Sequence, residues 1–376
     1  MSYKSIDLLQ KELGNTVFNY TKDQKKAAGR ALGTFVEIIT YYLLDSWGFS
    51  RNVAIETPLR EFSNPGITHN VEFTLHPCVC SENISFKISE LPLTPKKILP
   101  KIHNAIENLI IDVNNLVSSS GQLKNACKIR HTDKIMTLAT LTSKTQDALE
   151  VNVSDLLLFP FAMFECKRVG VEEGMRKGPQ TIEKAKQGAY VARAVSALQR
   201  LRRRDGNLMG FLEKEDGGDS LIGEYYDLLN TMIDVPENSS LLKDFVLTIG
   251  VISNHGNWFT RDNMNKELEV LAQSYDWLLF LSDSGLSEFI ESCLLSGDYP
   301  EIKHAFESSY PKTDDNRFTK TAINMDAHFA LKDYFFRNKN NIFSWFNLIA
   351  PRNKTIADLQ NQLTVLQKKQ WETIYP

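Results

Sequence analysis

Apolar residues recur along the chain with two different periods, and these periods predict an alternation of helices and strands. Residues 27–47 form a long, largely apolar run that Gly48 ends, which is typical of a helix and its stop signal. The helical period predicts further helices at 97–118, 176–204 and 262–274, and a mostly helical region from 285 onward. Alternating or unbroken apolar runs predict strands at 51–62, 69–76, 151–158, 161–169, 244–253 and 276–282.

The order of these segments predicts the fold class. Between 244 and 282 an apolar strand, a helix and a second apolar strand follow one another, which indicates a parallel pair in a shared sheet. We therefore expect an α/β protein with a mixed central β-sheet flanked by helices, and with largely helical insertions and C-terminal region.

Polar stretches divide this pattern and predict the domain organisation. A segment rich in Ser, Thr and Lys at 119–150 predicts a loop with short strands, and a glycine- and acid-rich segment at 205–222 predicts a loop or a joint between subdomains. We expect a core of residues 1–284 with insertions at about 78–150 and 205–243, followed by a mainly helical region at 285–376. The last helix carries a seam that fits packing within the same chain better than a dimer contact: Ile356, Leu359, Leu363 and Leu366.

Composition narrows the function classes. The 376 residues carry a net charge of only −3, which excludes a purely electrostatic nucleic-acid binder but allows a local basic groove beside an acidic cluster. No apolar run is long enough for a membrane span, and the polar N-terminal residues do not resemble a secretory signal. Five cysteines without a regular framework predict reduced thiols and a cytoplasmic location. His76, Cys78 and Cys80 lack the second pair of ligands that structural zinc sites need.

One face of the strand at 161–169 carries two charged residues on a segment that is otherwise largely apolar. Strand side chains alternate, so Met163, Glu165 and Lys167 share one face. Such charges are costly unless they are paired or bind a metal ion, although a solvated ion pair on an edge strand is the alternative. Two carboxylates can hold Mg²⁺, which acidifies a bound water, while a lysine orients that water and stabilises developing negative charge. This combination indicates phosphodiester hydrolysis.

The second carboxylate is expected from Asp155, provided that the strand register allows it. Phe159 and Pro160 separate the two apolar runs and predict a hairpin. A two-residue turn would pair Asp155 with Phe164 on the wrong face, whereas a three-residue loop or a bulge would place it diagonal to Glu165. Glu72, on another apolar strand, is the competing ligand, and the sequence leaves that choice open.

Asp155 followed by Glu165-Cys166-Lys167 resembles the motif of the PD-(D/E)xK nuclease superfamily, and type II restriction endonucleases in particular. The order of an acid-bearing helix, then strands, then a helix after the motif also resembles that family. The resemblance implies a restriction-endonuclease-like core in which Asp155 and Glu165 bind Mg²⁺, with Mn²⁺ as a substitute. It makes Lys167 catalytic and Glu37, on the first helix, an auxiliary catalytic acid.

Two departures from the family pattern weaken parts of this assignment. Ser154 precedes Asp155 where the family usually has proline. Gln187 and Tyr190 resemble polar residues that some members place on the following helix, but their spacing is one residue shorter than the common one.

The resemblance implies a Mg²⁺-dependent, sequence-specific endonuclease for double-stranded DNA that belongs to a restriction–modification system and acts as a homodimer. A structure-specific repair or recombination nuclease of the same superfamily and a non-catalytic DNA-binding protein are the alternatives. Basic and amide side chains are candidates for contacts with DNA: Lys124, Lys128, Arg130, Lys134, Gln187, Arg202 and Arg203.

Overall fold

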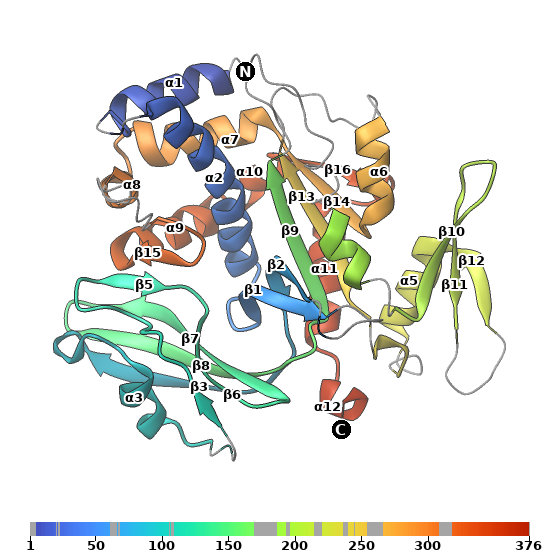
Figure 1. The fold of residues 1–376 in the computed structure, drawn as a ribbon, viewed down its shortest axis with the longest axis horizontal. Helices are drawn as coiled ribbons and strands as arrows, with labels where there is room; N and C mark the ends of the chain where they lie inside the picture. Colours follow the sequence, from blue (N-terminus) through green and yellow to red (C-terminus); the bar gives the residue numbers. More distant parts are fainter. Residues whose placement is uncertain are drawn as a thin grey trace.

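A six-stranded mixed sheet forms the centre of the molecule, and its strands come from distant parts of the chain (Figure 1). The computed structural model describes residues 5–375 except 20, 22, 61–65, 67, 105, 107–108, 169–185, 193–195, 214–219, 236–239, 244, 254–265 and 308–317. The strands, in spatial order, are β1 (Val53–Arg60), β2 (Thr68–Leu75), β9 (Ala162–Arg168), β13 (Leu247–Ser253), β14 (Trp277–Leu281) and β16 (Phe346–Ala350). β9, β13 and β14 run parallel, and the remaining neighbours are antiparallel. Every residue of β13 and β14 is buried, as expected for parallel strands covered on both faces.

Helices cover both faces of this sheet. α2 (Gln24–Ser46) packs on one face, begins at the N-cap Asp23 and ends before Gly48, whose φ of 90° suits glycine. α1 (Ile6–Thr16) packs against α2. The helix at 186–192 and α6 (Lys266–Ser274) cover the other face through a separate apolar cluster. The α/β class, the mixed central sheet and the flanking helices are thereby confirmed.

A second sheet is inserted between β2 and β9, so the prediction of largely helical insertions is wrong for this insertion, which is mainly β-structure. Its five antiparallel strands, in spatial order, are β3 (Cys78–Lys87), β8 (Ala148–Leu157), β7 (Ile135–Lys144), β6 (Cys127–His131) and β4 (Ile110–Ile111). Short elements accompany it: η1 (Ile88–Glu90), α3 (Pro95–Ile98), η2 (Leu99–Lys101) and β5 (Gln122–Lys124). The chain enters and leaves this sheet at one place, because Leu157 N donates to Pro77 O at 3.0 Å and Phe161 N donates to Leu75 O at 2.8 Å.

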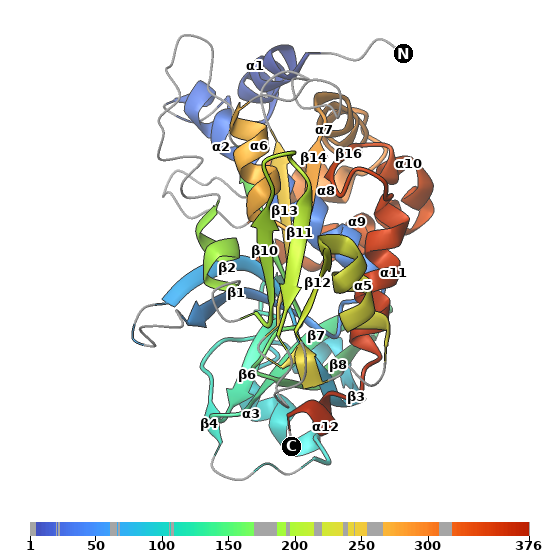
Figure 2. The same ribbon diagram turned by 90° about the vertical axis from the view of Figure 1, so that its right-hand side faces the viewer.

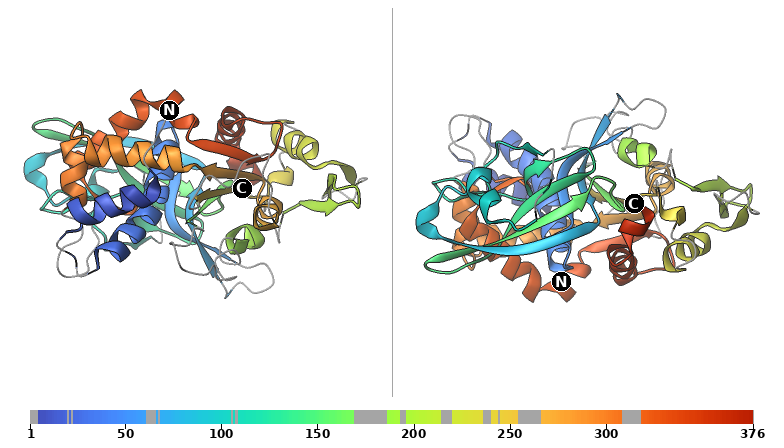
Figure 3. Two further views of the ribbon diagram at one scale, coloured as in Figure 1. Left: turned by 90° about the horizontal axis from the view of Figure 1, so that it is seen from above. Right: turned by 90° about the horizontal axis from the view of Figure 1, so that it is seen from below.

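A small three-stranded sheet lies at the end of the molecule opposite the second sheet (Figures 1 and 3). It consists of β10 (Leu198–Arg202), β11 (Leu208–Leu212) and β12 (Leu221–Glu224), followed by α5 (Tyr225–Asp234). Buried Asp276 ties it to the central sheet, since this carboxylate accepts from Arg200 Nη2 at 2.7 Å, from Tyr225 Oη at 2.5 Å and from Thr248 N at 2.8 Å. We call this sheet the wing.

The C-terminal region is mostly helical, as predicted, but it also completes both the central sheet and a smaller one. Its elements are α7 (Asp283–Ile290), the π-helical turn η4 (Glu291–Leu295), α8 (Pro300–Glu307), β15 (Ala322–Asn324), α9 (Met325–Arg337), α10 (Lys339–Phe343), β16, α11 (Ile356–Gln367) and α12 (Trp371–Ile374). β15 pairs with β5 of the insertion. α11 lies beside α5 (Figure 2), and its apolar seam is buried within the same chain. Because β16 joins the central sheet, residues 285–376 contribute to the same core as residues 1–284. The domain boundary at 284 stays a prediction.

Three predictions of local structure are wrong. The expected helix at 97–118 ends after η2, and apolar side chains of its supposed stripe, such as Ile110 and Val113, are exposed instead of forming a buried face. The expected helix at 176–204 does not reach its basic end, because 198–202 form β10. The expected hairpin does not exist, since β8 and β9 lie in different sheets. None of the helices in the described ranges is both long enough and apolar enough to traverse a lipid bilayer.

Candidate active site

Glu165 and Lys167 lie on β9, in the middle of the central sheet. The Glu165 side chain is only 1% exposed, and Lys167 Nζ lies 2.9 Å from Glu165 Oε1 and 3.0 Å from Glu72 Oε1. β9 is flanked by β2 and β13, so the reading as a solvated ion pair on an edge strand is wrong. A buried carboxyl group beside a lysine on a central strand needs a compensating interaction, which makes this position the strongest candidate site.

Glu72 reaches the same place because the alternation of side chains along β2 is interrupted at this residue, so that Val71 and Phe73 lie on opposite faces of the sheet. The ladder between β2 and β9 ends at the pair Phe73–Phe164, so Glu72 is the next residue on its strand. Phe73 packs in the apolar cluster beneath α2, whereas Val71 packs in the cluster beneath the helix at 186–192. Opposite this change of face, Glu56 on β1 has a φ of 54°, a left-handed conformation that non-glycine residues adopt at a cost. Glu72 can therefore contact groups on both sides of the sheet.

Lys320 brings two further acids into the cluster. Its Nζ lies 3.3 Å from Glu37 Oε2, 3.4 Å from Glu56 Oε1 and 3.7 Å from Glu72 Oε1, and its side chain is only 7% exposed. Glu37 projects from α2, as the resemblance implies for an auxiliary acid. The structure thus gathers Glu37, Glu165 and Lys167 as predicted, together with Glu72, the competing ligand.

Burial and neighbouring charges shift the pKa values of Glu37, Glu72 and Glu165. Burial, reinforced by the adjacent Glu72 carboxylate, raises the pKa of Glu165 to about 8 although Lys167 opposes the change. Burial acts to raise the pKa of Glu72 too, but the ammonium groups of Lys167 and Lys320 outweigh it and the pKa is lowered. Burial raises the pKa of Glu37 despite the attraction of Lys320. Such opposed shifts on adjacent carboxyl groups are typical of functional sites.

The donor set fits a hard divalent cation held by two carboxylates. Glu165 Oε2 and Glu72 Oε2 are buried, and within the part of the chain that the structure describes they have no hydrogen-bond partner other than the contact between the two carboxyl groups themselves. Within the same residues there is no group of three or more His, Cys, Asp and Glu side chains arranged to hold a metal ion. Mg²⁺ commonly uses only one or two carboxylates and keeps several waters, so Glu72 and Glu165 suffice.

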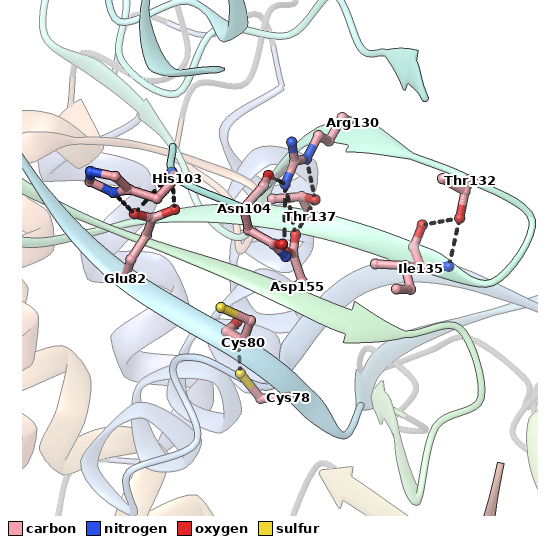
Figure 4. A network of polar contacts seen from close by, with 10 residues as sticks. All are labelled: Cys78, Cys80, Glu82, His103, Asn104, Arg130, Thr132, Ile135, Thr137 and Asp155. Carbon is pink, nitrogen blue, oxygen red and sulfur yellow. Dashed lines mark hydrogen bonds and ion pairs between the residues drawn. The ribbon is translucent and has the colours of Figure 1, made fainter. Parts of the chain in front are cut away.

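Asp155 lies elsewhere, and its predicted position next to Glu165 is wrong. It projects from β8 in the second sheet, where it accepts from Thr137 Oγ1 at 2.5 Å and Asn104 Nδ2 at 2.6 Å and pairs with Arg130 Nη2 at 3.4 Å (Figure 4). β8 pairs with β3 and β7, whereas β9 pairs with β2 and β13. The apolar runs around Phe159 are adjacent in sequence because the chain crosses from one sheet to the other there.

The candidate DNA contacts have different environments. Arg130 is buried against Asp155 and Thr137, so its predicted contact with DNA is wrong for this conformation. Lys128 pairs with Asp112 at 3.5 Å. Lys124 is half-buried on β5, and Lys134 is exposed in the turn between β6 and β7.

The remaining candidates lie nearer the central sheet or on the wing. Gln187 is exposed on the helix at 186–192. Its neighbour Gly188 packs so closely that a Cβ atom there would lie 3.3 Å from Glu165 Oε2. Arg202 and Arg203 are exposed at the end of β10. Among the exposed basic candidates, Lys134 lies close to the junction between the second sheet and the central sheet, where its carbonyl accepts from Leu158 N at 3.0 Å, and Arg202 and Arg203 lie on the wing.

Sequence reasoning missed Lys320 and Glu56. Lys320 stands in a polar segment without periodicity, and Glu56 lies on a strand whose irregularity the sequence does not mark. His76 is not a zinc ligand here, because its Nε2 bonds Thr74 Oγ1 at 2.7 Å and its Nδ1 bonds Leu157 O at 2.8 Å. No family model, no curated protein and no solved structure matches the chain.

Proposed function

We propose that the protein is a metal-dependent endonuclease whose site consists of Glu72, Glu165 and Lys167. The observation that carries the proposal is the contact of one lysine ammonium with two buried carboxylates on neighbouring strands, at 2.9 and 3.0 Å. Glu72 takes the place that the sequence motif gave to Asp155. The acid–acid–lysine set is then complete, with a different first member.

The order of elements around the site supports the same family. An acid-bearing helix (α2) precedes β1 and β2, β9 carries Glu165 and Lys167, and the helix at 186–192 and then β13 follow. This is the order that the resemblance to PD-(D/E)xK nucleases implies. A restriction-endonuclease-like core, with an eighty-residue insertion separating the two acidic strands, is therefore part of the proposal.

The chemistry follows from the arrangement of the side chains. Glu72 and Glu165 would hold Mg²⁺, or Mn²⁺ in its place, and the bound ion supplies an acidified water and a Lewis acid for the phosphate. Lys167, fixed by both carboxylates, orients the attacking water and stabilises charge that develops on the phosphoryl oxygens. Glu37 acts as the auxiliary acid from α2, and it is linked to Glu72 by the ion pairs that both acids form with Lys320.

The proposed substrate is double-stranded DNA, cut at a specific sequence by a cytoplasmic homodimer in a restriction–modification system. A dimer addresses both strands with two sites. The exposed basic groups Lys134, Arg202 and Arg203 would contact phosphates on either side of the site.

The test is a digest of unmodified plasmid and phage DNA with Mg²⁺, with the ends sequenced. Discrete fragments with common ends support a restriction enzyme, and smeared or branch-dependent products favour a repair or recombination nuclease. DNA binding without cleavage under all metal conditions would refute the enzyme proposal. The matched variant is Glu165→Gln, which should bind DNA and cut nothing.

A further inference from the structure

Lys320 is surrounded by carboxylates in a way that resembles a bound cation. Three acids from three separate elements, Glu37 of α2, Glu56 of β1 and Glu72 of β2, point oxygens at its Nζ at 3.3 to 3.7 Å. All three contacts are ion pairs, and Lys320 also donates a hydrogen bond to Glu37. The side chain is more than nine-tenths buried, so these acids and not water are its principal partners.

The fold fixes the backbone that carries this lysine. Asn125, itself buried, donates from Nδ2 to Lys320 O at 2.9 Å, and its backbone N donates to Thr321 O at 2.8 Å. Immediately afterwards, β15 pairs with β5. The inserted segment, through Asn125 and β5, therefore holds the backbone of Lys320 in place from outside the central sheet.

The net charge of the cluster indicates the effect of placing Lys320 beside these acids. Four carboxylates and two ammonium groups make up the cluster, so an excess of two negative charges remains when all are ionised. One divalent cation between Glu72 and Glu165 neutralises that excess. Without Lys320, the carboxylates of Glu37, Glu56 and Glu72 would face one another with no cation between them, the first and last partly buried and Glu56 59% exposed.

We propose that Lys320 is a built-in cation that occupies the place between these three carboxylates and limits the site to one divalent ion per chain. The inference rests on the proposed function, because it takes Glu72 and Glu165 as the ligands of that ion. Lys320 is then a positioning residue: it holds Glu72 from one side while Lys167 holds it from the other. Glu37 contributes by anchoring Lys320 instead of binding metal itself.

Counting bound Mn²⁺ in the full-length protein tests the proposal, by calorimetry and by the paramagnetic resonance signal of free Mn²⁺. Wild type should bind one ion, and Lys320→Met, which keeps length and loses charge, should bind two. Adding Glu37→Gln to Lys320→Met should return the count to one. The matched control is Lys332→Met, which breaks a different ion pair with α2, to Asp45 at 3.3 Å, and should leave the count at one.

The other outcomes separate this inference from the proposed function. One ion in folded Lys320→Met, or two in wild type, overturns the role of Lys320 and leaves the nuclease proposal standing. No ion in wild type overturns the metal ligands, and the role of Lys320 survives only if Lys320→Met gains an ion. If Lys320→Met does not fold, Glu37→Gln alone decides. The wild-type count, with a Kd weakened by no more than about 100-fold as for a group that orients a metal ligand, supports the inference, and loss of the ion overturns it.

Discussion

The decisive comparison is between Glu72→Gln and Asp155→Asn, because each removes one of the two acids that compete for the same role. Both substitutions keep shape and remove charge. Groups that merely orient metal ligands change affinity or activity 10- to 100-fold, so loss of the ligand Glu72 should reduce cleavage by at least about 100-fold. Asp155→Asn should leave cleavage within about threefold, because it lies in another sheet.

The two substitutions should rank in the opposite order by their effect on stability, so that Asp155→Asn lowers the free energy of unfolding more than Glu72→Gln does. Asp155 is 4% exposed and pairs with buried Arg130, and breaking a buried ion pair by removing one partner costs about 3–5 kcal/mol. We expect the low end, about 3 kcal/mol, because the Asn oxygen can still accept from Thr137. Urea unfolding gives the stabilities, and cleavage is measured at a temperature at which every variant is folded.

One result would refute this reasoning. A folded Asp155→Asn protein that binds DNA but no longer cuts, beside an active Glu72→Gln protein, would return the metal-ligand role to Asp155. The arrangement of the second sheet during catalysis would then differ from the one described here. Mn²⁺ binding to the two variants provides an independent check of the same assignment.

Three further predictions concern packing, pH and salt. Gly188→Ala should destabilise the fold by about 1–3 kcal/mol, because its Cβ would lie 2.8 Å from a valine methyl of β2, whereas Gly33→Ala on α2, with nothing within 4 Å, should stabilise it by up to about 1 kcal/mol in the same thermal melts. Burial lowers the pKa of His76 to about 4. Between about pH 6.5 and 4 the unfolded chain therefore binds one proton that the folded chain does not, and the free energy of unfolding falls as the pH falls. Between pH 7 and 5 this decrease amounts to about 2 kcal/mol, and His76→Gln should abolish it in urea unfolding measured at the two pH values. Arg202→Ala and Arg203→Ala should leave the melting temperature unchanged and each lower the salt slope of DNA binding by about one; an unchanged slope excludes the wing from the DNA contact.

The sequence predicts the chemistry of β9 because that chemistry is local. Alternation alone places Glu165 and Lys167 on one face, and apolar neighbours alone indicate that the strand is buried. The parallel pair of β13 and β14 is likewise confirmed, since an unbroken apolar strand must be covered on both faces. The position of Glu37 follows from its place on a long helix that covers the sheet.

The partner acid could not be chosen from the sequence, because Asp155 and Glu72 both stand on apolar strands. The choice depends on which strands pair. The inserted sheet separates β2 from β9 in sequence although they are paired, and it leaves β8 next to β9 in sequence although they lie in different sheets. Phe159 and Pro160 look like a turn, but there the chain passes between two sheets, and Phe159 stacks on Tyr375 at a ring distance of 4.7 Å. The role of Lys320 depends on a tertiary contact with Asn125, which no local pattern encodes.

The entry and exit of the second sheet have a consequence for how this chain could diverge. Because Leu157 bonds Pro77 and Phe161 bonds Leu75, the inserted sheet behaves as a cassette with both ends at one junction, where loop closure costs little. Exchanging the cassette would leave the acidic strands paired. It would also remove Asn125, so that any replacement would keep Glu72 and Glu165 on neighbouring strands but would have to supply its own contact for the backbone of Lys320.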